Sequence, residues 1–456
     1  MRRDLATHAV ADLIEQGRLE VGDGYRAKNS ELSDDGIPFA RAGNISDGFA
    51  FDGADRLPFR SLDRVGSKIS RPGDVVFTSK GTVGRFALVA PRTPRFVYSP
   101  QLCYWRSKDA EFLDPGYLYY WMNSREFYLQ FKGVSGQTDM AEYVSLRDQR
   151  RMRVTIPPIA EQHRIARILG TLDDKIELNR RMNETLEETA RAVFKSWFVD
   201  FDPVRAKAVG RDPGIPPHLA DLFPARLVDS ELGEIPEGWE VRPLGDLLEL
   251  LETGGRPKGG VARYASGVPS IGAESIAGLG IHDFSKTKYV PREYFDAMKR
   301  GHVEDADVLL YKDGGKPGQF EPHVTLVGGG FPFAVCAINE HVYRVRVDSA
   351  LGQIYLYYWL SSEIAGAEMR NRGTGVAIPG LNSTQVKSLP TLVPTQPVAA
   401  HFGHACGPLV SRIFANCNQS RALTATRDAL LPRLISGEIS SSAIGRREAA
   451  STPSGP

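Results

Sequence analysis

Residues 165–197, IARILGTLDDKIELNRRMNETLEETARAVFKSW, carry a strict heptad. Positions spaced alternately by four and three share one face: Ile165, Leu169, Leu172, Ile176, Asn179, Asn183, Leu186, Ala190, Val193 and Trp197. This period predicts a helix that packs on another helix as a coiled coil. The surrounding residues 160–199 contain no proline and one glycine, so we expect roughly 60 Å of helix, at about 1.5 Å per residue.

The same seam recurs later in the chain, at a constant offset of 237 in the numbering. Its members are Phe402, Cys406, Leu409, Ile413, Asn416, Ser420, Leu423, Arg427, Leu430 and Leu434. Asn179 and Asn183 lie near the middle of the first seam, as Asn416 and Ser420 do in the second, and Arg427 indicates that the regular seam ends near it. If the helices run antiparallel with opposed centres, the four polar residues meet in one layer. Buried amides must bond to each other, so we expect this layer to fix the helix register.

Four segments upstream of the two seams also recur in the same order. The pairs are 37–45 and 268–276, 74–84 (DVVFTSKGTVG) and 307–318 (DVLLYKDGGKPG), 118–124 (LYYWMNS) and 356–362 (LYYWLSS), and 155–157 and 392–394. The offset drifts from 231 to 238, which indicates a duplicated domain. Within each copy, β-branched and aromatic runs between Gly, Pro and Asp predict a mixed sheet, and helical segments are expected at 117–131 and 353–369.

The expected fold class is therefore α+β, with two duplicated mixed α/β domains and two long helices. We expect the first domain at 1–156, the first helix at 157–202, an extended proline-rich connector at 203–239 and the second domain at 240–392. The second helix is expected at 393–437 and a disordered tail at 438–456.

Composition bounds the function. Of 456 residues, 42% are hydrophobic and 24% charged, which is typical of a globular protein, and the net charge of +1 excludes an indiscriminate polycation. No apolar stretch approaches the length of a membrane-spanning helix, and the N-terminal MRRDLATHAV lacks an apolar signal region. The four cysteines form no CxxC pair, as expected for reduced thiols. We therefore expect a cytoplasmic protein without a membrane segment.

Familiar catalytic motifs are missing from the sequence. It contains no GxxxxGK[ST], no GxGxxG after a strand, and no Asn-Pro-Pro or Asp-Pro-Pro followed by an aromatic residue. Residues 173–175 (DDK) resemble part of a metal-dependent nuclease site, but the heptad turns both acids toward solvent. His401, His404 and Cys406 lack a fourth zinc ligand, and Cys406 is expected at the seam.

Glycine-rich turns beside basic residues are better candidates for binding. Glycines let backbone N–H groups approach a phosphate closely, and Lys and Arg neutralise its charge. The candidate DNA-binding residues are Arg41, Asn44, Ser79, Lys80, Thr82, Arg85, Gln137, Lys312, Lys316, Arg370 and Arg372. We assign Lys80, Arg85, Lys312 and Lys316 mainly to phosphates, although each turn taken singly fits an ordinary β-turn equally well.

Five segments carry a resemblance to a known family. They are 157–169 (PPIAEQHRIARIL), 172–176 (LDDKI), 197–201 (WFVDF), 233–239 (GEIPEGW) and 427–438 (RDALLPRLISGE). In these the chain resembles the specificity subunits of type I restriction-modification systems. The first domain departs from the pattern because it has no counterpart of 233–239. Residues 397–400 (PVAA) stand where 160–163 (AEQH) begin the first helix, so we expect an asymmetric helix start.

The resemblance implies two target recognition domains, each of which reads one half of a bipartite target in double-stranded DNA. It also implies antiparallel helices that separate the domains and dock two methyltransferase subunits. Methylation and cleavage would come from these and from restriction/translocase subunits, with S-adenosylmethionine, ATP and Mg bound there and no cofactor on this chain. The alternatives are a self-sufficient DNA-modifying or DNA-cutting enzyme and a coiled-coil scaffold that does not bind DNA.

Overall fold

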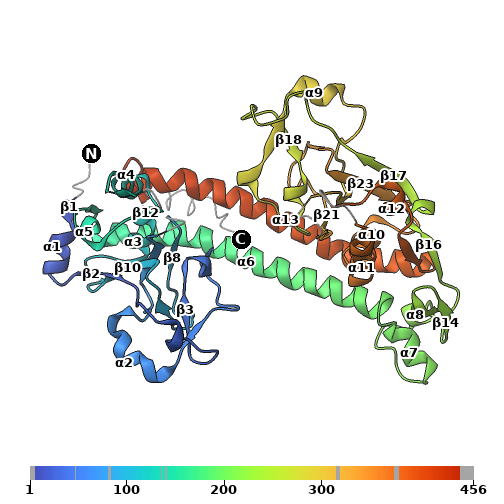
Figure 1. Cartoon of the computed structure of the whole chain (residues 1–456), viewed down its shortest axis with the longest axis horizontal. Coiled ribbons are helices and arrows are strands. Elements are labelled where there is room, and N and C mark those ends of the chain that lie inside the picture. Colours follow the sequence, from blue (N-terminus) through green and yellow to red (C-terminus); the bar gives the residue numbers. More distant parts are fainter. Residues whose placement is uncertain are drawn as a thin grey trace, which may run out of the picture. The chain divides into compact units, whose positions relative to one another are not determined.

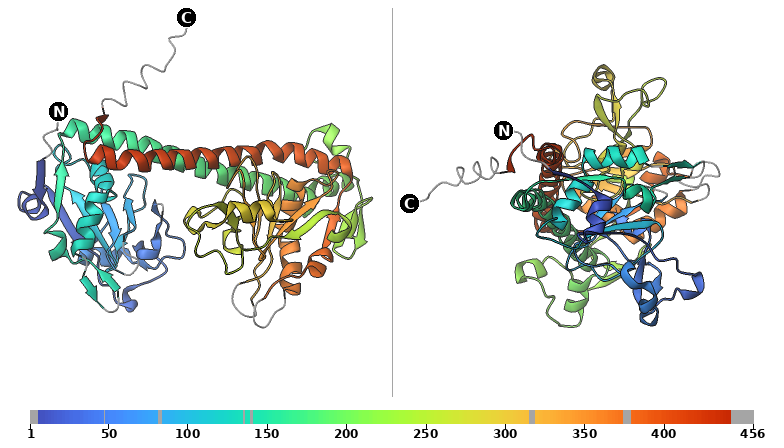
Figure 2. Two further views of the ribbon diagram at one scale, coloured as in Figure 1. Left: turned by 90° about the horizontal axis from the view of Figure 1, so that it is seen from above. Right: turned by 90° about the vertical axis from the view of Figure 1, so that its left-hand side faces the viewer.

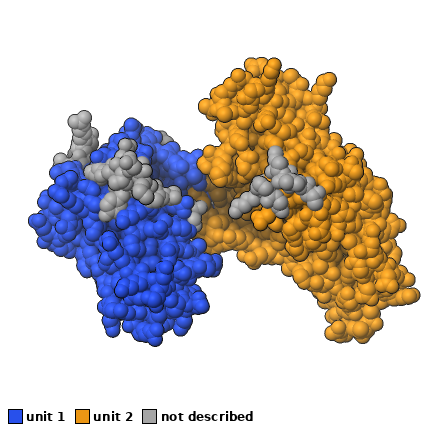
Figure 3. All heavy atoms as spheres, in the orientation of Figure 1, with its two compact units in different colours: residues 1–175, 423–456 blue, residues 176–422 orange. Residues whose placement is uncertain are grey.

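The computed structural model describes residues 6–46, 48–80, 84–134, 136–138, 141–314, 319–373 and 379–441. The chain forms two compact units, Met1–Lys175 with Leu423–Pro456, and Ile176–Ala422 (Figure 3). Two predicted site residues, Thr82 and Lys316, lie outside the described residues, as do positions 442–456 of the expected tail.

The first unit contains a four-stranded antiparallel sheet in the order β2-β10-β7-β8. These strands are β2 (Leu19–Asp23), β7 (Val75–Thr78), β8 (Phe86–Leu88) and β10 (Leu102–Ser107). A three-stranded sheet pairs β3 (Ile37–Ala40) antiparallel with β6 (Arg56–Leu57) and parallel with β9 (Val97–Tyr98). The remaining strands are β1 (Ala6–Ala9) paired with β13 (Arg153–Ile156), β4 (Ile45–Ser46) with β5 (Gly48–Phe49), and β11 (Gly136–Thr138) with β12 (Ala141–Tyr143). Short helices α1 (Val10–Glu15), α2 (Leu62–Val65) and α5 (Leu146–Gln149) complete this part of the unit.

The second unit repeats this plan (Figure 1). Its four-stranded sheet has the order β17-β23-β20-β21, from β17 (Leu248–Thr253), β20 (Val308–Tyr311), β21 (Val324–Leu326) and β23 (Val342–Val347). Strand β18 (Val268–Ile271) pairs antiparallel with β19 (Lys288–Val290) and parallel with β22 (Ala337–Ile338), as β3 does with its neighbours. Strand β16 (Glu240–Pro243) pairs with β24 (Pro390–Val393). The second unit also contains two short helices, α9 (Arg292–Ala297) and α12 (Ser383–Lys387). The predicted duplication and mixed sheets are confirmed.

Each helix expected beside a sheet is in fact two helices. In the first unit, α3 (Pro115–Met122) is followed by α4 (Arg125–Val134), and in the second, α10 (Gln353–Leu360) by α11 (Glu363–Arg372). A serine causes both breaks, because its side chain caps the second helix: Ser124 Oγ accepts from the Phe127 N–H, and Ser362 Oγ from the Ala365 N–H. Both predicted segments are therefore helical, and each contains a break that the prediction did not include.

The two seam helices are α6 (Ile159–Phe198) and α13 (Gln396–Ile435), which run side by side (Figure 2). In the first unit Asp173 pairs with Arg427, and in the second Asn183 bonds Asn416 and Phe194 packs on Phe402. Numbers rise along one helix as they fall along the other, so the predicted antiparallel pairing is confirmed.

Both seam helices start at equivalent positions, since Gln396 is the repeat equivalent of Ile159. The expected asymmetric start was wrong, because Pro397 occupies the first helical turn, where a missing N–H costs nothing. Helix α13 also continues past Arg427, whose side chain is held by Asp173.

The first residues of the expected tail are folded against the first unit. Ile439 packs on its apolar core, and Ser441 is buried with its hydroxyl 2.8 Å from Glu161 Oε2. The prediction of disorder was therefore wrong for residues 438–441. It rested on the low apolar content of the tail, whereas Ser441 is held by a hydrogen bond to Glu161 on α6.

The connector expected to be extended is folded. It contains α7 (Asp202–Ala208), α8 (Pro217–Ala220) and a hairpin of β14 (Leu227–Ser230) and β15 (Gly233–Pro236). Its apolar side chains explain the error, since Val204, Phe223 and Trp239 are buried in the core of the second unit. The prolines do not keep the connector extended, because Pro203 and Pro217 lie in the first turns of α7 and α8.

The repeated aromatic segments lie in the cores. Tyr117 and Trp121 are fully buried in the first unit, and Tyr355 and Trp359 almost fully in the second, so their interpretation as core residues is confirmed. Of the helices in the described ranges, none combines the length and apolar character required to span a membrane.

Candidate nucleic-acid interface

In the first unit, three predicted residues meet at the turn after β3. The Arg41 N–H donates to Asn44 Oδ1 at 2.8 Å, and Asn44 Nδ2 donates to the Ala50 carbonyl at 2.9 Å. Arg85 Nη1 reaches the same turn, donating to the Ile45 carbonyl at 3.2 Å. Arg41 and Arg85 remain exposed, and Arg41 Nη2 also donates to Asp55 Oδ2 at 2.6 Å, so the turn presents two guanidinium groups, one of them paired with a carboxylate.

Ser79 and Lys80 lie at the end of β7, against this turn. Gln101 connects the two segments, because its Oε1 accepts from the Ala42 N–H at 3.1 Å and its carbonyl accepts from the Ser79 N–H at 2.9 Å. Ser79 is only 1% exposed, and its hydroxyl donates a hydrogen bond to the Gln101 carbonyl. Ser79 therefore shapes the turn, whereas the partly exposed Lys80 lies at the surface. No sequence motif pointed to Gln101.

The equivalent place in the second unit has different chemistry. Lys312 follows β20, and its amine is paired with the neighbouring Asp313. Asp313 also accepts from His341 Nδ1, and Glu340 pairs with Arg256 at 2.6 Å. Lys312 and His341 hold the pKa of Asp313 below its usual value, against the effect of its burial. In this unit the lysine and the histidine share one carboxylate, whereas in the first unit Asp55 pairs with Arg41 and Arg85 bonds a backbone carbonyl.

The other predicted residues are distributed over different elements. Arg370 lies on α11 and pairs with Glu321 at 3.2 Å and with Glu363, while Arg372 pairs with Glu368. These glutamates offset part of the positive charge on which the prediction relied. Gln137 lies on β11, outside the turn residues described above.

Sequence patterns missed a buried ionic cluster that recurs in both units. Arg106 on β10 donates through Nε to Asp74 at 2.6 Å and through Nη1 to Glu20 at 3.3 Å. Arg344, Asp307 and Glu252 build the same cluster, with Nε of Arg344 2.6 Å from Asp307. Asp74 and Asp307 are fully buried and immediately precede the strands that lead to the predicted turns. The signal was present, because equivalent acids and arginines recur at offsets of 232 to 238.

The polar seam residues form two neighbouring pairs in the second unit, and these pairs together make a polar layer. Asn179 Nδ2 donates to Ser420 Oγ at 3.1 Å and to Gln419 Oε1 at 2.9 Å. Asn416 Nδ2 donates to Asn183 Oδ1 at 2.9 Å. Asn179 and Asn416 are at most 1% exposed, so these amides depend on one another for partners.

The aspartate considered as a nuclease residue has another role. Asp173 accepts from Tyr120 Oη at 2.6 Å and from Arg427 Nη1 at 2.8 Å, so the expectation that it points to solvent was wrong. Tyr120 is on α3 and Arg427 is on α13. The heptad of α6 alone therefore could not predict that they bond Asp173. Within the described ranges, no group of three or more His, Cys, Asp and Glu side chains is arranged to hold a metal.

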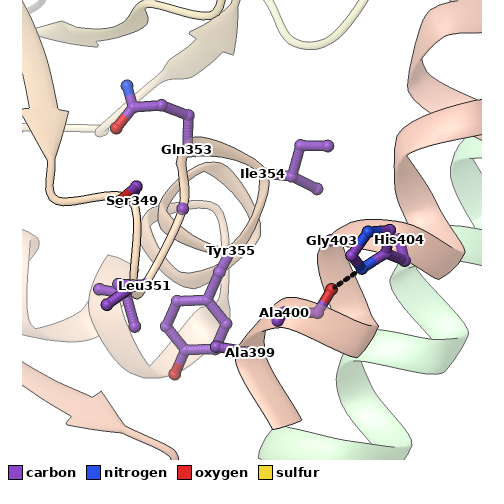
Figure 4. Close-up of a pocket in the computed structure, with 11 residues that line it drawn as sticks. Ser349, Leu351, Gln353, Ile354, Tyr355, Ala399, Ala400, Gly403 and His404 are labelled. Carbon is purple, nitrogen blue, oxygen red and sulfur yellow. Dashed lines mark hydrogen bonds between the residues drawn. The ribbon is translucent and has the colours of Figure 1, made fainter. Parts of the chain in front are cut away.

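A pocket of about 330 Å³ lies between the first turns of α10 and α13 (Figure 4). His404 at its edge donates Nδ1–H to the Ala400 carbonyl at 2.9 Å. Gln353 Nε2 donates to the Ala306 and Val345 carbonyls, and Gln353 Oε1 accepts from the Val347 N–H. The Gln353 amide and Nδ1 of His404 are thus engaged within the protein.

Comparisons with known proteins agree with the duplicated fold. Residues 19–188 match the family described as type I restriction modification DNA specificity domain. The MjaIX specificity subunit of Methanocaldococcus jannaschii is 25% identical over 395 residues, which cover 85% of this chain and 82% of the relative. The HindI specificity subunit of Haemophilus influenzae is 24% identical, over 83% of this chain and 89% of that one.

A solved structure has the same fold. The S subunit of a type I restriction-modification system from M. genitalium superposes with a TM-score of 0.56 and 12% identity, over 95% of this chain and 96% of that one. The duplicated domains, the paired helices and these matches agree, and the chain is similar to the specificity subunits of type I restriction-modification systems.

Proposed function

We propose that this chain reads a bipartite target in double-stranded DNA, one half with each recognition domain. The observation that carries the proposal is the duplication of a complete domain, including its buried ionic cluster and the turn after β7 or β20. One contiguous target would require a single such domain. The two turns differ in chemistry, as expected for domains that recognise different half-sites.

In the first domain, Arg41 and Arg85 would contact the phosphate backbone near the turn shaped by Asn44 and Gln101. Exposed guanidinium groups suit this role, because they neutralise phosphates and bind them through two parallel bonds. In the second domain, Asp313 and His341 would contact base edges, since a carboxylate oxygen that already accepts one bond can accept another from the amino group of cytosine. Lys312 would act mainly by orienting Asp313.

The seam helices would dock two methyltransferase subunits, and restriction/translocase subunits would complete the assembly. This part rests on the family and on the names of the relatives, which are specificity subunits. The partners would carry the chemistry and bind S-adenosylmethionine, ATP and Mg, and the assembly would work in the cytoplasm.

Methylome sequencing of cells that express the chain with its methyltransferase subunit tests the proposal. We expect one split motif with a constant spacer. A chimera in which residues 240–392 are exchanged for those of a related specificity subunit should change one half of that motif and retain the other. A contiguous motif, or a change in both halves, would contradict modular reading.

Expression of the chain without its methyltransferase subunit is the control. We expect no methylation, because the partner supplies catalysis. Methylation by the chain alone would instead identify a self-sufficient modifying enzyme.

A further inference from the structure

Two of the family-like segments meet at one carboxylate in the first unit. Asp173 belongs to 172–176 (LDDKI) and Arg427 to 427–438 (RDALLPRLISGE). Asp173 Oδ1 accepts from Arg427 Nη1 at 2.8 Å, while Oδ2 accepts from Tyr120 Oη at 2.6 Å. Tyr120 lies on α3, within the core of the recognition domain. The carboxylate therefore joins the domain to both seam helices.

The second unit contains a corresponding contact. Tyr358, the repeat equivalent of Tyr120, donates from Oη to Glu187 Oε2 at 2.9 Å. Tyr357 and Arg191 donate to the other oxygen of Glu187, at 3.2 and 2.8 Å. Glu187 is on α6, like Asp173, although the repeat equivalent of Asp173 is Val410 on α13. The two copies thus build the same tyrosine–carboxylate contact with acids at non-equivalent positions.

The tyrosine–carboxylate bonds are directional, unlike the apolar contacts around them. Burial, together with the adjacent Asp173 carboxylate, raises the pKa of Tyr120 well above its usual value, and burial and Glu187 do the same for Tyr358. Both phenols therefore remain protonated donors at neutral pH. A short bond from a hydroxyl to a carboxylate restricts the angle between donor and acceptor, whereas apolar contacts are non-directional.

We infer that Asp173 and Glu187 are positioning residues that set how each recognition domain is oriented on the seam helices, and thereby which spacer length is accepted between the half-sites. This inference rests on the proposed bipartite function. It assigns the 172–176 segment to orientation and predicts no direct contact between Asp173 and DNA.

Removing single hydroxyl groups tests the inference with matched controls on the same helices. Tyr120→Phe deletes the bond to Asp173, and Tyr358→Phe deletes the bond to Glu187 Oε2 while the bond from Tyr357 to Oε1 remains. Tyr117→Phe and Tyr355→Phe delete hydroxyls of buried tyrosines whose bonds go to strands β13 and β24, to the Thr155 and Leu392 carbonyls at 2.7 Å. Each variant is expressed with the methyltransferase subunit, and its methylome is sequenced.

We expect Tyr120→Phe and Tyr358→Phe to raise methylation at sites whose spacer differs by one base pair by about tenfold, the factor expected for one bond to a charged group. The half-site bases should stay the same, and the two control variants should retain the native spacer. Unchanged spacer selectivity in Tyr120→Phe and Tyr358→Phe would overturn the inference, as would relaxed base preference within a half-site. If the unmodified chain yields no split motif, the proposed function itself fails.

Thermal unfolding of all four variants separates orientation from folding. We expect each hydroxyl deletion to lower the melting temperature by a similar amount, because each removes one buried bond. If spacer selectivity follows melting temperature across the four variants, the bonds act through stability alone and the inference is wrong.

Discussion

At the residue scale, each of the two units concentrates buried charge on one aspartate. Asp74 is fully buried and bonds Arg106 through both of its oxygens, at 2.6 and 2.8 Å. Tyr98 Oη donates to the same carboxylate at 2.5 Å. Burial, followed by the effect of Asp74, raises the pKa of Tyr98 well above its usual value, so the phenol remains a donor.

Asp74→Asn should lower the free energy of unfolding by about 3–5 kcal/mol, because it leaves the Arg106 charge buried without its partner. Urea denaturation monitored by tryptophan fluorescence measures the change. The control is Asp55→Asn, which breaks the half-exposed pair with Arg41 and should cost no more than about 1 kcal/mol. Equal effects of the two substitutions would show that the buried cluster adds no more than a surface pair.

Arg85→Ala tests the exposed turn of the first domain. We expect weaker binding to every duplex sequence and a salt dependence of log K reduced by roughly one, because one phosphate contact is lost. Electrophoretic titrations at several salt concentrations measure both quantities, and Arg226→Ala, an exposed residue paired with Glu237, is the control. Relaxed sequence preference with an unchanged salt slope would assign Arg85 to a base.

At the element scale, the polar layer should determine the register of α6 and α13. Replacing Asn179, Asn183, Asn416 and Ser420 with leucine should raise the free energy of unfolding, because Asn179 Oδ1 is already buried without a described partner. Asn416→Leu alone should cost about 1–3 kcal/mol, since it leaves Asn183 Oδ1 without its donor.

The quadruple variant should also permit slipped registers, which methylome sequencing would detect as more than one spacer length. Retention of one spacer and full affinity would show that packing elsewhere along the helices sets the register.

Local periodicity explains why the helices could be predicted to within a few residues. The heptad specifies its own face, and the repeat offset locates the second copy. By contrast, the hydrogen bonds of Asp173 come from Tyr120 and Arg427. These two residues are distant in sequence and meet Asp173 only after α3 and α13 pack on α6. The folded connector was missed for the same reason, since Trp239 is buried by residues of other elements.

At the scale of the whole molecule, duplication made the architecture predictable but left the binding surfaces undetermined. The strands around the two turns correspond, yet residues 79–85 span seven positions where 312–323 span twelve. Pairing Lys80 with Lys312 by alignment did not reveal that Lys312 bonds its own neighbour Asp313. When two equivalent loops differ in length, the bonding partners of their side chains cannot be predicted from the alignment alone.

The first unit is assembled from two stretches of chain, and this has a consequence for synthesis. Leu434 and Ile435 are buried in the same core as Ile165 and Leu169. On the ribosome, the apolar face around Ile165 therefore emerges long before the side chains that cover it. With roughly 270 residues still to be added at roughly 5–20 residues per second, that delay lasts on the order of 13 to 54 s. The nascent chain must therefore keep an uncovered helix face from associating with other proteins until translation is nearly finished.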